Sequence, residues 1–235
     1  NTLVTVAAAL AAVGIAVGIL LALQPDAGPP SPAALRTGVL ALPDPVRDSG
    51  TSVEEALYRR RSVRSYREEP LTLGEVAQLL WAAQGVTDPA LGRRTAPSAG
   101  ALYPLETYLV AGDVQGLPDG IYRYRPQEHA LEMVADGDRR EELYRASVSQ
   151  EAVRDAPAAI VLSGVYDRTT VKYGERGIRY VHMEAGHAAE NVYLQAESLG
   201  IGTVTIGAFF DGEVVRLLRM EEGENPLYVM PIGRR

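Results

Sequence analysis

A run of 21 residues without a charge, from Leu3 to Leu23, is the feature that most constrains how this chain folds. At a rise of about 1.5 Å per residue, a helix of that length spans about 30 Å, the thickness of the hydrocarbon core of a bilayer. Secretory signals have a shorter apolar region, and the run lacks the polar face of a helix in a soluble core. It predicts a membrane anchor over residues 1–23 and a cell-membrane location, with the side of the remaining domain left open.

Proline dominates the next stretch, so we expect residues 24–50 to form an extended linker. Residues 51–235 are numerous enough to bury one sizeable core, and the chain has no cysteine for disulfides or a thiol nucleophile. The net charge of −7 argues against a nucleic-acid partner, which needs a broad basic surface.

Two helix starts carry the spacing of a capping box. Ser52 precedes Glu55 by three residues, and Thr72 precedes Glu75 in the same way. We therefore expect one helix to begin near residue 53 and another near residue 73. Gly85 marks the expected end of the second helix.

The remaining segments alternate between strand and helix patterns. We expect strands at 105–112, 157–165, 204–210 and 226–233, a hairpin over 120–137, and helices over 138–147 and 184–200. This interspersion predicts an α+β fold with a mixed sheet flanked by helices.

Residues 59–68, RRRSVRSYRE, concentrate five arginines in an acidic chain. On an extended backbone, Arg60, Ser62 and Arg64 point to the same side, where two guanidiniums and a hydroxyl suit a phosphate. The alternative is a set of cations that simply decorates the end of a helix.

The turn at 97–100, Pro-Ser-Ala-Gly, has small side chains and accessible backbone amides, which let a flat ligand approach closely. An ordinary loop before the strand at 105 is the alternative.

We expect residues 168–180 to form a long polar loop, in which Lys172 and Tyr173 place two proton donors side by side. A solvated loop without function is the alternative. His182 and His187 are five residues apart, so they diverge around a helix, and no metal site is expected.

In order along the chain, RRRSVRSY, PSAGALYPLETYLV, KYGERGIRYVHMEAGHAAENVYLQAESLGIGT, IGAFFD and PLYVMPIGR resemble the signatures of the nitroreductase superfamily of FMN enzymes. The similarity covers residues 51–235 and is strongest to the SagB/ThcOx-type dehydrogenase branch. It implies a nitroreductase-like FMN domain over those residues and a homodimer with FMN at the subunit interface.

The resemblance also implies roles for individual residues. The phosphate ligands would be Arg60, Arg61, Ser62, Arg64 and Arg234, and the turn beside the isoalloxazine would be Pro97, Ser98, Ala99 and Gly100. Gln150 would face the polar edge of the ring, with the amides of Ile206, Gly207 and Ala208 near N5. In azoline-oxidising members a Lys-Tyr pair is catalytic, which corresponds to Lys172 and Tyr173.

These features predict a membrane-tethered, FMN-dependent oxidoreductase acting on a small molecule or a peptide, with an azoline ring as one candidate substrate. The alternative is a non-catalytic flavin-binding, sensing or assembly module with the same fold. The hydride donor stays open.

Overall fold

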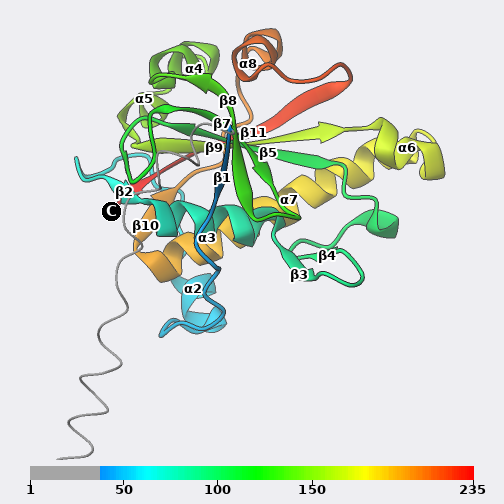
Figure 1. Ribbon diagram of the computed structural model, residues 1–235, viewed down its shortest axis with the longest axis horizontal. Coiled ribbons are helices and arrows are strands. Elements are labelled where there is room, and N and C mark those ends of the chain that lie inside the picture. Colours follow the sequence, from blue (N-terminus) through cyan, green and yellow to red (C-terminus); the bar gives the residue numbers. More distant parts are fainter. Residues whose placement is uncertain (1–37) are drawn as a thin grey trace, which may run out of the picture.

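A computed structural model describes residues 38–235 of the protein (Figure 1). The predicted anchor, residues 1–23, lies outside the described residues. Within residues 38–235 no helix is both long and apolar enough to cross a membrane. The cell-membrane location predicted from the sequence is therefore corrected, since no described helix supports it.

A seven-stranded sheet forms the centre of the fold, in the order β1-β8-β7-β5-β9-β11-β10. Its strands are β1 (Val39–Ala41), β5 (Leu105–Ala111), β7 (Gly120–Arg125), β8 (Ala130–Asp136), β9 (Ala158–Val165), β10 (Ile201–Thr203) and β11 (Glu224–Arg234). Two small pairs lie apart from it: β2 (Leu71–Thr72) with β6 (Val114–Gln115), and β3 (Val86–Asp88) with β4 (Arg93–Arg94).

Every strand pair of the seven-stranded sheet is antiparallel. Among residues 38–235, parallel pairing is confined to β2–β6 and to a bridge between Ser62 and Thr203 at the β10 edge. The predicted α+β class is confirmed, but the central sheet is antiparallel rather than mixed. β1 lies within the stretch expected to be linker and pairs with β8.

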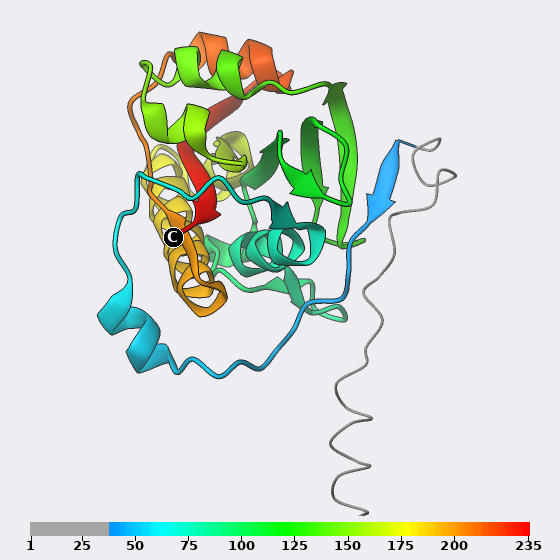
Figure 2. The same cartoon turned by 90° about the vertical axis from the view of Figure 1, so that its left-hand side faces the viewer.

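Helices cover both faces of the sheet (Figures 1 and 2). One face packs against α3 (Leu73–Gln84) and α7 (Arg176–Leu199), and the other against α4 (Arg140–Ala146), α5 (Glu151–Asp155) and α8 (Asp211–Leu218). Neighbouring residues alternate between the two cores: Leu109 and Ile160 face the α3–α7 side, whereas Val110 and Val161 face the other.

The predicted helix caps are present. The Ser52 hydroxyl accepts the backbone N–H of Glu55 at the start of α2 (Val53–Arg59), 3.1 Å away. Thr72 and Glu75 form a reciprocal capping box on α3. Gly200 ends α7 in the left-handed conformation, with φ of 68°.

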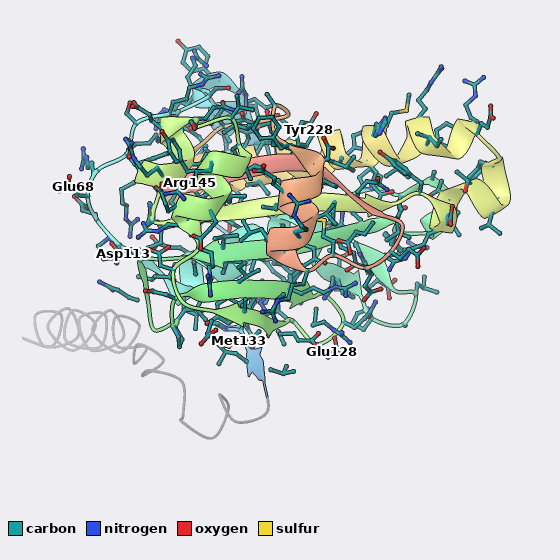
Figure 3. The ribbon with its side chains drawn as sticks, turned by 90° about the horizontal axis from the view of Figure 1, so that it is seen from above. Glu68, Asp113, Glu128, Met133, Arg145 and Tyr228 are labelled. Carbon is teal, nitrogen blue, oxygen red and sulfur yellow. The ribbon has the colours of Figure 1, made fainter. Side chains whose placement is uncertain are left out.

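The expected loop over residues 168–180 is wrong, because this stretch folds as α6 (Asp167–Tyr173) and the first turn of α7. A Cβ at Gly177 would lie 2.8 Å from the backbone nitrogen of Thr170, so glycine permits the two helices to meet. Seen from above, the arm formed by α6 and the start of α7 projects beyond the sheet, on the side away from Asp113 (Figure 3).

The strand expected at 204–210 is also mostly absent. Only Ile206 pairs with the sheet, through an isolated bridge to Val229. The chain then leaves the sheet to enter α8 at Asp211. The alternation of apolar residues in this stretch reflects burial of Val204 and Ile206, not a continuous ladder.

Candidate functional site

The end of α2 carries the residues predicted to bind a phosphate. Beyond Arg60 the backbone is extended, and the N–H of Val63 donates to the carbonyl of Thr203 over 2.9 Å. The guanidinium carbon of Arg60 lies 5.1 Å from the ring centre of Tyr193, and a 3.2 Å hydrogen bond joins the Ser62 and Tyr193 hydroxyls. Tyr193 on α7 thus holds Arg60 and Ser62 at the β10 edge.

The other arginines of this stretch differ in their surroundings. Arg61 donates from Nη1 to the carbonyls of Tyr58 and Arg60, at 3.0 and 2.8 Å. These hydrogen bonds satisfy carbonyl groups at the end of α2, as expected if the arginine only stabilises the end of the helix. Arg64 is exposed to solvent. Arg60 is half-buried and lies 3.8 Å from a carboxylate oxygen of Glu190.

Arg234 is engaged elsewhere in this chain. Its guanidinium forms an ion pair with Glu75, with an Nη1–Oε1 distance of 2.6 Å and an Nη2–Oε2 distance of 3.0 Å. The same carboxylate closes the capping box of α3. The backbone carbonyl of Arg234 accepts the N–H of Arg67 over 3.0 Å, so the chain end and the arginine stretch run side by side.

The segment predicted to face the flavin N5 continues from the same edge. The N–H of Thr205 donates to the Tyr193 hydroxyl at 2.9 Å. Further along, the side-chain amide of Gln150 donates to the carbonyl of Ala208 at 3.2 Å. A Cβ built at Gly207 would meet no atom within 4 Å, so this backbone is open to a close approach. The structure therefore aligns Arg60, Ser62, the 206–208 segment and Gln150 along one edge.

A second group forms around the predicted Lys-Tyr pair. A Cβ at Gly100 would lie 2.8 Å from both the Lys172 Nζ and the Tyr173 hydroxyl. Gly100 has φ of 64°, a conformation in which other residues are strained. The turn at 97–100 and the pair on α6 thus meet in space, although more than seventy residues separate them in the sequence.

The two groups lie at different ends of α7. Tyr193 is 17 residues from Arg176, where α7 begins, which corresponds to about 26 Å along the helix axis. In Figure 1, α6 lies on the right of the molecule, whereas β10 and α2 lie on the left.

Two hollows of about 430 and 500 Å³ lie between residues 43–53 and the helices α3 and α7. Both are bordered by Trp81, Gln195 and Ser198. No residue predicted to bind the flavin lines either hollow. Both hollows therefore lie apart from the candidate site.

Several side chains of the site were missed by sequence reasoning. Tyr193 and Thr205 connect the two predicted parts of the flavin edge, but on α7 Tyr193 reads as one more core residue. Glu184, also on α7, is only 2% exposed, and burial raises its pKa to about 7. Glu184 could have been identified from the sequence, because it is a charged residue among the apolar positions of the predicted helix.

The amino-acid sequence is similar to a known family model and to proteins from other organisms. The family model described as the nitroreductase family matches residues 57–234. The nitroreductase-family protein MJ1384 of Methanocaldococcus jannaschii is 48% identical over 183 residues, which cover 78% of this chain and 91% of that protein. The microcin B17-processing protein McbC of Escherichia coli is 29% identical over 158 residues, covering 65% of this chain but 58% of McbC.

Solved structures agree with this placement. A crystal structure of a nitroreductase-family protein from Ralstonia eutropha JMP134 superposes with a TM-score of 0.72 and 32% identity, covering 83% of this chain and 89% of that one. The resemblance seen in the sequence motifs is confirmed by the family match and by these relatives. The chain belongs to the nitroreductase family of oxidoreductases.

Proposed function

We propose that this protein is an FMN-dependent oxidoreductase whose flavin lies along the edge that runs from Arg60 to Ala208. The observation that carries the proposal is the position of the Tyr193 hydroxyl, which bonds both to Ser62 and to the N–H of Thr205. One side chain thereby joins the phosphate ligands and the backbone beside the ring. Bound FMN supplies hydride transfer at N5.

The residues at the two ends of this edge fit the two ends of the cofactor. Arg60, Ser62 and Arg64 offer two guanidiniums and a hydroxyl for an anion. At the other end, the open backbone at Gly207 lets a flat polar ring approach. The Gln150 side chain donates from Nε2 to the carbonyls of Ser147 and Ala208, which leaves its Oε1 to accept from the ring. Arg234 would join the phosphate ligands only by giving up its ion pair with Glu75.

Lys172 and Tyr173 are the proposed catalytic pair, with the ammonium Nζ and the phenol hydroxyl available to hold or move a proton. Their distance from Tyr193 along α7 supports a homodimer in which the α6 arm of one copy approaches the flavin edge of the other. Exposed apolar side chains on α2 and α6 support such an interface, among them Tyr58 at 80% and Val171 at 83% exposure.

The relatives support a candidate substrate class. The name of McbC describes the processing of microcin B17, and we propose a peptide substrate with an azoline ring as the first candidate for this chain. A small molecule reduced at the flavin is the second. The exposed α6 arm is compatible with either, because it leaves Lys172 accessible.

The test is to purify the full chain, add FMN and record the visible absorbance of bound flavin, then its bleaching by NADH or NADPH. We expect bound flavin and reduction by at least one donor. Arg60→Ala with Arg64→Ala should release FMN, whereas Arg145→Ala, at an exposed arginine of α4, should not. Flavin that binds but is reduced by no donor would favour the non-catalytic module, and absence of binding would overturn the proposal.

A further inference from the structure

A buried carboxyl group lies beneath the turn that meets Lys172 and Tyr173. Glu184 is 2% exposed, and within residues 38–235 neither of its carboxylate oxygens has a hydrogen-bond partner of normal geometry. A buried polar group without partners costs free energy that an apolar side chain would not. Such a residue is a candidate for function instead of stability.

Two hydrogen-bond donors, the side chains of Ser98 and Arg94, lie close to Glu184. The hydroxyl of Ser98 lies near enough to oppose the rise of the Glu184 pKa, and so does the positive charge of Arg94 on β4. Arg94 donates from Nη1 to Gln84 over 2.9 Å, but its buried Nε has no partner among the described residues. Burial lowers the pKa of Arg94, and the nearby charges of Glu106 and Glu184 oppose this shift.

Ser98 belongs to the turn itself and also shapes it. Its Oγ accepts the N–H of Tyr103 over 2.9 Å. Gly100 at the end of the turn has φ of 64°, and Ala101 and Tyr103 directly after it have φ of 54° and 46°, so two strained residues follow the glycine. A strained turn depends on its supports, and Ser98 is one of them.

The other side of the turn contacts α6. Gly100 faces the Lys172 Nζ and the Tyr173 hydroxyl, and Arg168 donates to the carbonyl of Tyr103 over 3.4 Å. Arg168 in turn pairs with Glu106 at 2.6 Å. The turn is thus held between Glu184 with Arg94 on one side and the charged groups of α6 on the other.

We propose that Glu184 is a positioning residue for the 97–100 turn. The protonation state of its carboxyl group sets the position of this turn relative to Lys172 and Tyr173. As the neutral acid, Glu184 leaves Ser98 and Arg94 in the arrangement of the structure. As the carboxylate, it accepts from the Ser98 hydroxyl and the Arg94 Nε–H, which draws the turn and β4 toward α7. The inference rests on the proposed oxidoreductase function, since it assigns Lys172 and Tyr173 to the reaction.

The first experiment compares the pH dependence of kcat/KM in the FMN-loaded wild type, Glu184→Gln and Glu213→Gln. Glu213 is an exposed glutamate of α8 and serves as the matched control. We expect an inflection near pH 7 in the wild type and in the control, and its loss in Glu184→Gln. FMN affinity should stay within about threefold in all three proteins. An unchanged inflection in Glu184→Gln, or none in the wild type, would overturn the inference.

The second experiment needs neither flavin nor substrate. Amide hydrogen exchange over residues 95–104, corrected for the intrinsic effect of pH, should show rising protection above pH 7 in the wild type and no such rise in Glu184→Gln. Ser98→Ala keeps Glu184 but removes a donor to its carboxylate, so the transition should move to higher pH. This variant decides the matter if Glu184→Gln fails to fold.

The two experiments separate the two proposals. If the protein shows no flavin-dependent turnover but the exchange transition is present and depends on Glu184, the oxidoreductase function fails while the control of the turn by Glu184 stands. If turnover is present and the exchange of the turn is indifferent to Glu184, the positioning role fails alone.

Discussion

The hydroxyl of Tyr193 lies 3.2 Å from the hydroxyl of Ser62 and 2.9 Å from the backbone nitrogen of Thr205. One phenol on the central helix therefore links the arginine stretch after α2 to the segment that follows β10. Both segments would contact the same flavin, at its phosphate and at its ring. The relative position of the two segments therefore depends on the hydroxyl oxygen of Tyr193, which belongs to α7 and to neither segment.

Tyr193→Phe removes that oxygen while keeping the ring against Arg60. We expect FMN to bind more weakly by about 1 kcal/mol, or about fivefold in Kd, because two hydrogen bonds that fix the site are lost. Titration of flavin fluorescence measures the change. Tyr122→Phe on β7 is the matched control, because it also removes a hydrogen-bonded phenol oxygen, which donates to the carbonyl of Pro118 away from the site, and it should leave the affinity unchanged.

Lys172→Ala and Tyr173→Phe each remove a group proposed to handle a proton. Turnover should fall by about 100-fold or more, the typical contribution of a positioned acid or base, while FMN stays bound. Steady-state rates with flavin occupancy read from the visible spectrum separate the two effects. Arg216→Ala, which removes an exposed cation on α8, should retain full turnover. Equal rates in the Lys172 and Arg216 variants would exclude the lysine from the reaction.

Gly100→Ala tests the contact between the turn and α6. An added Cβ would lie 2.8 Å from the Lys172 Nζ and the Tyr173 hydroxyl, so the pair must move. Gly92→Ala is a close control, because Gly92 has φ of 62° and nothing within 4 Å of its Cβ position. Both variants should lose about 1 kcal/mol from backbone strain in thermal unfolding.

Only Gly100→Ala should lose activity, by about tenfold or more, because small displacements of reacting groups are costly. The comparison of kcat between the two glycine variants measures this. A similar loss in both would attribute the effect to backbone strain and not to the contact with Lys172 and Tyr173.

The raised pKa of Glu184 makes a prediction for stability. The folded protein holds this proton up to about pH 7, whereas the unfolded chain releases it at the ordinary, lower value. Between those two values the folded state binds more protons, so the free energy of unfolding falls as pH rises and stays low above pH 7. Glu184→Gln, which does not titrate, lacks this loss.

Relative to wild type, Glu184→Gln should therefore gain about 1–3 kcal/mol more at pH 8 than at pH 4.5. Urea unfolding at the two pH values measures the difference. Glu213→Gln should show no such dependence, because its carboxylate is exposed in the folded protein. A Glu184 variant that tracks the wild type at both values would show that this carboxyl ionises normally when buried.

Local sequence determined the starts and ends of several elements. Ser52 with Glu55 and Thr72 with Glu75 specify helix starts, and Gly200 specifies a helix end, because the atoms that satisfy these backbone groups lie within a few residues. The same holds for the hairpin of β7 and β8, whose strands are joined by a short turn. The order of motifs likewise sufficed to identify the family.

The stretch at 168–180 shows where local reasoning fails. Its polar composition suggested a loop, but the α6–α7 corner depends on Gly177 packing against the backbone of Thr170, and packing of that kind has no local signal. The expected strand at 204–210 failed for a related reason. Hydrophobic alternation reports burial, and burial of Ile206 is satisfied by a single bridge to Val229.

The sequence by itself determined which residue types are available for an anion and a flat ring, and in what order they occur. Only the tertiary structure decided that Tyr193 joins Ser62 to Thr205, that Gly100 meets Lys172, and that Arg234 pairs with Glu75. The physical reason is distance along the chain. Capping and turn formation act between neighbours, whereas these contacts join residues brought together by packing of α3, α6 and α7 around the sheet.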